Sequence, residues 1–106
     1  MKVERLSDFH RGWIIGDFHP SVLRTPDFEV GVMYHPKGEI WPAHTHHVLW
    51  EYNVLVKGSM TMQNRLLTEG DVFTLEPGDV ADPTFHEDCI IVCVKVPSIL
   101  GDKHLV

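Results

Sequence analysis

The stretch that decides the fold of this 106-residue chain is residues 38–58, GEIWPAHTHHVLWEYNVLVKG. It begins and ends with a glycine: five residues separate the first glycine from His44, and six separate Glu51 from the last. On a strand, positions i and i+2 point to the same face, so His44 and His46 can present two imidazoles to one point. Glu51 adds a carboxylate from the start of the next apolar run. Two imidazoles and one carboxylate suit first-row transition metals and leave coordination positions open for a substrate.

This spacing resembles the first motif of the cupins, which reads glycine, five residues, His-x-His, three or four residues, Glu, six residues and glycine. The second motif of that family reads glycine, five residues, Pro-x-Gly, two residues, His, three residues and Asn. Residues 70–81 keep both glycines in register, but Ala81 stands where the third histidine of the family falls. A one-residue slip would put Asp82 at the metal position and His86 at the Asn position. The resemblance spans residues 28–96 and implies a double-stranded β-helix, a jelly-roll barrel.

The rest of the chain consists of short β-rich runs separated by turn signals, without a segment of helical period. We therefore predict one all-β domain, since a chain of this length supports a single core. Residues 28–106 are expected to form the cupin β-barrel, and residues 1–27 an amino-terminal arm that packs on the barrel or on a second subunit. The predicted strands are residues 29–35, 40–46, 49–57, 59–63, 65–68, 71–75, 80–85 and 89–96.

The resemblance implies that His44, His46 and Glu51 hold a divalent transition metal, namely Fe²⁺, Mn²⁺, Ni²⁺ or Zn²⁺. Asp82 or His86 would take the fourth position, or water would fill it. The alternative is a chance His-x-His on a solvent-facing strand, but the framing glycines and the β-rich context favour the metal interpretation.

Four further residues are predicted to line the pocket. Asn53 shares the inward face with Glu51, and a buried amide requires hydrogen-bond partners, so it can contact a substrate or orient a ligand. Trp41, Met33 and Phe73 are either core packing or pocket wall, since ligand sites are mostly apolar with a few polar groups.

The run from Leu49 to Val56 is apolar on both of its faces. A strand of this kind is buried on both sides, so its outer face should be covered by the amino-terminal arm or by a partner. Because cupins are often dimers as well, we expect a homodimer.

Composition narrows the class of partner. The formal charge of −6 argues against nucleic acid or an anionic membrane as a partner. The chain starts without an apolar signal region and has no apolar run long enough to span a membrane, so we expect a cytoplasmic protein. Cys89 and Cys93 lie about 13 Å apart on an extended strand, beyond disulfide reach, and are expected to be reduced core thiols.

Two functions are compatible with these residues. The first is a metal-dependent cupin that acts on a small molecule in the barrel pocket, by dioxygenase-like or by isomerase- or lyase-like chemistry; the two-His-one-carboxylate set leans toward oxygen chemistry. The second is a non-catalytic cupin that binds or senses a small ligand with a weak or vacant metal site, which the missing histidine at Ala81 favours. The sequence assigns no catalytic residue, so whether the chain is an enzyme stays open.

Overall fold

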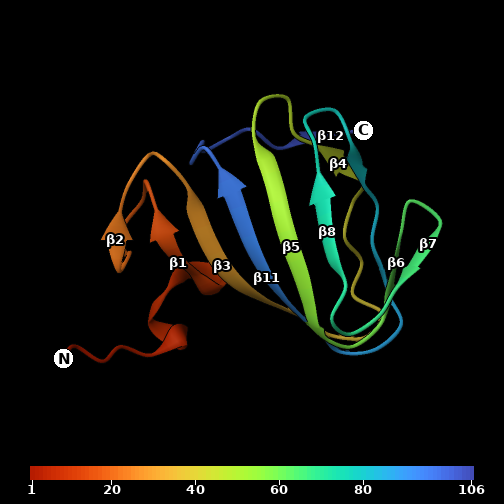
Figure 1. The fold of residues 1–106 in the computed structure, drawn as a ribbon, viewed down its shortest axis with the longest axis horizontal. Coiled ribbons are helices and arrows are strands. Elements are labelled where there is room, and N and C mark those ends of the chain that lie inside the picture. Colours follow the sequence, from red (N-terminus) through yellow and green to blue (C-terminus); the bar gives the residue numbers. More distant parts are fainter.

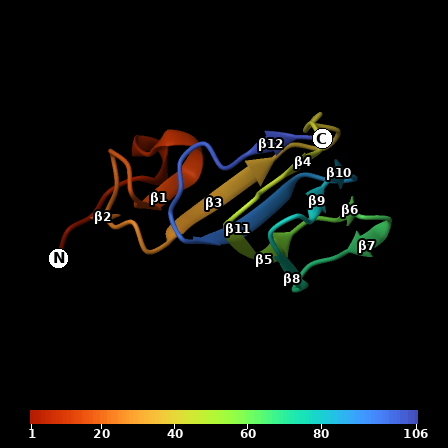
Figure 2. The same ribbon diagram turned by 90° about the horizontal axis from the view of Figure 1, so that it is seen from above.

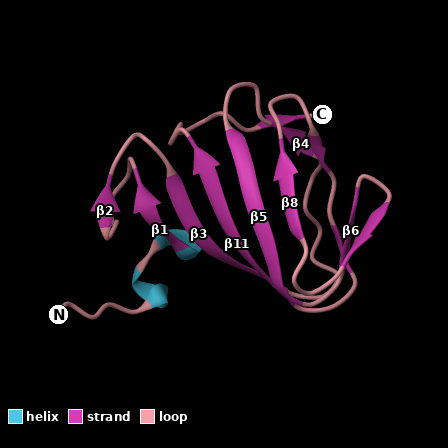
Figure 3. Cartoon of the chain, in the orientation of Figure 1, coloured by secondary structure: helices cyan, strands magenta, loops and turns pink.

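A computed structural model describes residues 1–106, and its regular structure is almost entirely strand. Helix is limited to two short 3₁₀ turns that precede the first strand, as Figure 3 shows. None of the helices is long and apolar enough to cross a membrane. The all-β prediction is confirmed. The elements are η1 (Leu6–Asp8), η2 (His10–Gly12), β1 (Trp13–Gly16), β2 (Leu23–Arg24), β3 (Glu29–His35), β4 (His44–Thr45), β5 (Trp50–Lys57), β6 (Met60–Met62), β7 (Arg65–Leu67), β8 (Val72–Leu75), β9 (Val80–Ala81), β10 (Thr84–Phe85), β11 (Cys89–Val96) and β12 (His104–Leu105).

The strands lie in two layers that enclose the core (Figure 1, Figure 2). One layer is a six-stranded sheet in the order β2-β1-β3-β11-β5-β8. The other consists of two three-stranded sheets, β10-β6-β7 and β12-β4-β9. Every pairing is antiparallel except that of β1 with β2. The candidate metal ligands therefore come from both layers, because β4 belongs to one and β5 to the other.

Alternation along β11 builds the core. Cys89, Ile91 and Cys93 point inward and are buried, and both cysteines are free thiols, as predicted. Leu55 and Met60 are almost completely buried beside them, each contributing about 1.5–3 kcal/mol of hydrophobic stabilisation. The core thus fills one end of the barrel and leaves its other end to polar residues.

Two predicted strands are shorter in the structure, each next to a proline. The strand expected over residues 40–46 is confined to His44–Thr45, because Pro42 has no N–H to donate and restricts the residue before it. The strand expected over residues 80–85 is split into β9 and β10 on either side of Pro83.

The glycine that closes the first motif is required by geometry. Gly58 has a φ of 99°, in the region that favours glycine. A Cβ there would lie 2.4 Å from the carbonyl oxygen of Asp88. The motif therefore ends where β5 turns sharply against the loop before β11.

The amino-terminal segment extends the large sheet. β1 pairs antiparallel with β3, bringing Trp13 opposite Gly31. A Cβ on Gly31 would lie 2.6 Å from the Trp13 ring, so glycine makes room for the indole against the sheet. This pairing places Trp13 at the open end of the barrel.

The outer face of the six-stranded sheet is apolar and exposed. Register places Tyr34, Tyr52, Val72 and Val96 on this face, and between 39% and 75% of each residue is exposed. The amino-terminal segment lies along the edge of the sheet in Figure 2 and leaves these residues uncovered. An apolar surface of this extent is typical of a protein contact.

Candidate metal centre

His46 lies between His44 and Glu51, in contact with the Glu51 carboxylate and beside the His44 ring. His44 lies in β4 and His46 directly after it, and both are buried, at 7% and 5% exposed. Their ring centroids are 5.2 Å apart. The Nε2 atom of His46 lies 3.3 Å from Oε2 of Glu51, which comes from β5 in the other layer. The i, i+2 spacing thus places the two histidine rings side by side, and His46 contacts the acid.

The donor set leaves buried polar atoms without partners. His46 Nε2, Glu51 Oε2 and Asn53 Nδ2 are buried and form no hydrogen bond. Buried polar atoms are nearly always satisfied, so unsatisfied ones that lie together call for an explanation. An imidazole nitrogen and a carboxylate oxygen at this separation match the donors that a first-row transition metal takes. His46 and Glu51 therefore present donor atoms that fit a divalent metal, with the His44 ring beside them.

Backbone carbonyls orient both imidazoles. The Nδ1 atom of His46 donates a hydrogen bond to the carbonyl of Asp102, and Nδ1 of His44 donates to the carbonyl of Pro42 at 3.3 Å. A carbonyl can only accept, so each Nδ1 carries a proton and Nε2 is the nitrogen left to bind a metal. Fixing the tautomer in this way is a usual feature of metal-binding histidines.

Protonation also favours metal binding. Burial lowers the pKa of His44, so its imidazole is neutral at physiological pH. Burial alone would raise the pKa of Glu51, but the adjacent His46 imidazole, the charge of Lys95 and the hydrogen bond from the Cys93 thiol together lower it. Burial and the neighbouring Glu51 raise the pKa of Cys93, so its thiol keeps its proton and donates to Glu51 Oε1 at 3.1 Å. A neutral imidazole and an ionised carboxylate are the ligating forms.

The carboxylate of Asp102 fastens the loop between the ligands. It accepts hydrogen bonds from the backbone N–H groups of His47, Val48 and Leu49, each at 3.0 Å. Although burial opposes it, these N–H groups and the His104 ring lower the pKa of Asp102 well below its usual range. Asp102 could not be predicted from the sequence, because nothing local marks an aspartate more than 50 positions away as a partner of the loop.

A second cluster of potential ligands surrounds Asp102. The ring of His47 stacks on that of His104 with centroids 3.5 Å apart, and His104 Nε2 lies 3.1 Å from Asp102 Oδ1. The Asp102 carboxylate already accepts three backbone hydrogen bonds besides this contact. Its oxygens are therefore already hydrogen-bonded to the loop. The cluster is better explained as a structural contact that holds the loop than as a metal site.

The structure resolves the register of the second motif. Ala81 lies directly opposite His44 in the β4–β9 ladder and is buried, so it occupies the third-histidine position without a slip. Asp82 is exposed and accepts a hydrogen bond from the backbone of Gln63 at 2.8 Å. His86 is exposed and bonds Thr61 Oγ1 at 2.6 Å. The structure therefore does not bring Asp82 or His86 to the candidate metal centre.

The predicted pocket residues separate into two groups. Asn53, Trp41 and Phe73 line a small interior cavity of about 70 Å³ together with His44 and Glu51. Met33 does not line this cavity. It packs against the core and borders an open groove beneath the amino-terminal segment.

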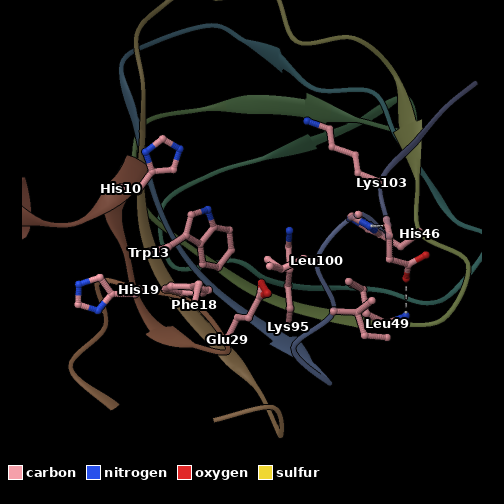
Figure 4. A pocket seen from close by; sticks show the side chains of 13 residues that line it. His10, Trp13, Phe18, His19, Glu29, His46, Leu49, Lys95, Leu100 and Lys103 are labelled. Carbon is pink, nitrogen blue, oxygen red and sulfur yellow. Dashed lines mark hydrogen bonds between the residues drawn. The ribbon is translucent and has the colours of Figure 1, made fainter. Parts of the chain in front are cut away.

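A larger cavity of about 270 Å³ lies at the barrel mouth (Figure 4). His46 forms part of its wall, and Trp13, Glu29, Lys95 and Lys103 line it as well. Figure 4 shows these side chains around one space, with His46 and Lys103 on one side and Trp13 on the other. The cavity therefore adjoins the candidate metal centre at His46.

Glu29 and Lys95 are residues of the candidate site that the sequence does not predict. They lie opposite each other on β3 and β11, and Lys95 in turn lies opposite Glu51 on β5, so the three form one inward row. Glu29 is 5% exposed, and its Oε1 accepts a hydrogen bond from Ser98 at 3.0 Å. Burial raises the pKa of Glu29, and the charge of Lys95 offsets this in part. Strand parity could have found both residues only once the pairing of the three strands was known.

Comparison with solved structures identifies the fold. A double-stranded β-helix protein from Klebsiella pneumoniae superposes with a TM-score of 0.70 at 23% identity, covering 100% of this chain and 97% of that one. KdgF from Halomonas sp. superposes with a TM-score of 0.61 at 20% identity, covering 69% of this chain and 72% of that one. DMSP lyase DddQ from Ruegeria pomeroyi gives 0.63 at 19% identity, covering 90% of this chain and 51% of that one. No protein-family model and no curated protein matches the chain.

The chain is a small protein with the double-stranded β-helix fold of the cupins. The resemblance seen in the first motif is confirmed at the level of the fold, and the fold prediction with it.

Proposed function

We propose that this protein binds one divalent transition metal through His44, His46 and Glu51 and acts on a small molecule held in the mouth cavity. The observation that carries the proposal is the pair of buried, unsatisfied atoms His46 Nε2 and Glu51 Oε2, which lie 3.3 Å apart. His46 also lines the mouth cavity, and Glu51 lines the small interior cavity. The fold is compatible with such chemistry, since one of the solved structures that share it is a DMSP lyase. Fe²⁺, Mn²⁺, Ni²⁺ and Zn²⁺ all suit this donor set.

The residues around the centre have separate roles. A bound metal would supply Lewis-acid polarisation of a substrate oxygen. Cys93 holds Oε1 of Glu51, which leaves Oε2 directed at the centre. Glu29 is the group suited to proton transfer, because its carboxyl lies in the cavity wall and burial moves its pKa toward neutrality. The presence of this acid favours isomerase- or lyase-like chemistry over oxygen chemistry.

The alternative function is a non-catalytic cupin that binds or senses a small ligand. It is favoured by Ala81, which gives the centre three protein ligands where the family motif would give four. The two functions differ in the need for Glu29: a sensor requires no acid at this position, whereas an enzyme that transfers a proton loses turnover in Glu29→Gln while it keeps its metal.

Metal titration tests the proposed function. Protein purified without an affinity tag and stripped with a chelator is titrated with each of the four metals in a calorimeter. At least one metal should bind at one equivalent per chain, and the bound metal should raise the melting temperature because it binds only the folded state. Failure of all four metals to bind stoichiometrically would reject the metal centre.

We also propose that the chain forms a homodimer through the outer face of the six-stranded sheet. The unmodified protein should sediment at twice the 12.1 kDa of the chain. Tyr52→Glu places a charge in the middle of the exposed apolar face and is expected to shift the mass to that of the monomer, because a buried unpaired charge is costly in an interface. Leu66→Glu alters a more exposed apolar residue on β7 and should leave the dimer intact. A monomeric unmodified protein at micromolar concentration would contradict the proposal.

A further inference from the structure

Two ammonium groups of the mouth cavity have no acceptor. The Nζ atom of Lys95 lies 4.7 Å from the ring of Trp13, and Nζ of Lys103 lies 4.3 Å from the ring of Trp41. Neither lysine forms a salt bridge or a hydrogen bond; the ion pairs of the protein lie elsewhere. Their contacts with the indole faces hold the cations in place but leave the N–H donors free.

The charges of the cavity wall favour an anion. Its two carboxylates are those of Glu29 and Asp102. The Asp102 carboxylate is taken up by the backbone N–H groups of residues 47–49. Glu29 is therefore the one uncommitted carboxylate of the wall itself, against two ammonium groups. Glu51 lies opposite Lys95 but outside the wall, and a divalent metal bound by Glu51 would offset its charge. A cavity of one sign with low-dielectric walls concentrates ions of the opposite sign.

The size and the apolar part of the wall limit the ligand. At about 270 Å³ the cavity is smaller than the pockets that hold drug-sized ligands, which start at roughly 300 Å³. Leu49, Ile99 and Leu100 supply aliphatic wall around the charged groups. The space thus suits a short carbon chain with an anionic end.

We propose that the substrate or ligand of this protein is a small organic acid whose carboxylate binds between Lys95 and Lys103 at the barrel mouth. This inference rests on the proposed function for the role of the neighbouring metal, but the lysine site itself can be tested with or without metal. An ammonium donates charge-assisted hydrogen bonds to a carboxylate, and the neutral amide of the same shape cannot replace that charge.

Matched acid and amide pairs test the proposal. Acetate, lactate and succinate are titrated by calorimetry into the unmodified protein, with and without bound metal, and compared with acetamide, lactamide and succinamide. At least one acid should bind at least tenfold more tightly than its amide. Lys95→Gln and Lys103→Gln should each weaken its binding roughly tenfold to hundredfold, the range for loss of a hydrogen bond between charged groups. Lys57→Gln, a change of an exposed lysine at the end of β5, should have no effect.

The outcomes separate this inference from the proposed function. Stoichiometric metal binding together with acids that bind no better than their amides would overturn the inference and leave the metal centre standing. Acid binding that is equal in Lys103→Gln and in the unmodified protein would overturn it as well, because the carboxylate would then bind elsewhere. Lys103 lies at the exposed rim, so this variant should fold even if Lys95→Gln does not.

Discussion

His44→Ala and His46→Ala are each expected to abolish stoichiometric metal binding. Each substitution removes an oriented imidazole from the proposed three-ligand centre, and loss of a direct ligand should cost at least the 10–100-fold in affinity typical of a lost supporting contact. Glu51→Ala should weaken binding strongly for the same reason. Calorimetric titration with the metal that binds the unmodified protein best measures all three variants.

Three nearby variants serve as controls. His47→Ala, Asp82→Ala and His86→Ala remove potential ligands that the structure places on exposed positions, so each should keep the affinity of the unmodified protein within about twofold. A large loss of metal affinity in Asp82→Ala would show that the second motif is shifted by one residue in solution, with Asp82 at the metal position. Unchanged affinity in both His44→Ala and His46→Ala, in protein with an unmodified circular dichroism spectrum, would reject the metal centre.

Asp102→Ala is expected to destabilise the fold by about 2–4 kcal/mol. It leaves three backbone N–H groups of residues 47–49 without their acceptor, and an unsatisfied buried donor costs about 1–3 kcal/mol, less where water can reach it. Metal affinity should fall about 10–100-fold as well, because the loop carries His46 and Glu51 on its two sides. Urea unfolding of the metal-free protein and metal titration measure the two effects separately.

Asp102→Asn is the matched variant, since it keeps one acceptor oxygen and should lose less than half as much stability. The pKa of Asp102 is lowered in the folded protein, so its contribution is complete above its unfolded pKa, 3.8 in a model compound, and is lost as the pH falls below that value. The difference between the unmodified protein and Asp102→Ala should therefore be constant near neutral pH and shrink in acid. Equal unfolding midpoints at pH 7 would contradict this role.

The local half of the site could be predicted from sequence. His44 and His46 follow strand alternation, and Glu51 fixes which residues of β5 face inward, so spacing sufficed for Asn53 as well. These predictions depend on periodicity within one strand, which the backbone imposes.

The other half depends on pairing between distant strands. Glu29 and Lys95 reach the centre only through the register of β3, β11 and β5, which no local pattern specifies. The absence of a slip at Ala81 likewise became visible only when His44 was found opposite it. Proline shortened β4 and divided the strand over residues 80–85, because the preference of the flanking residues for strand could not replace a missing N–H.

The contact between His46 and Asp102 joins residues 56 positions apart, and the carboxylate of Asp102 reaches the ligand loop across 53 to 55 positions. Closing so long a segment carries an entropy cost that only the folded barrel offsets. A peptide comprising residues 38–58 contains all three ligands, yet nothing in it would fix the imidazole of His46 or hold the loop in shape. Metal capture should therefore come late in folding, after the barrel has closed, and the ion should be held by the assembled architecture of the chain more than by the motif that marks it.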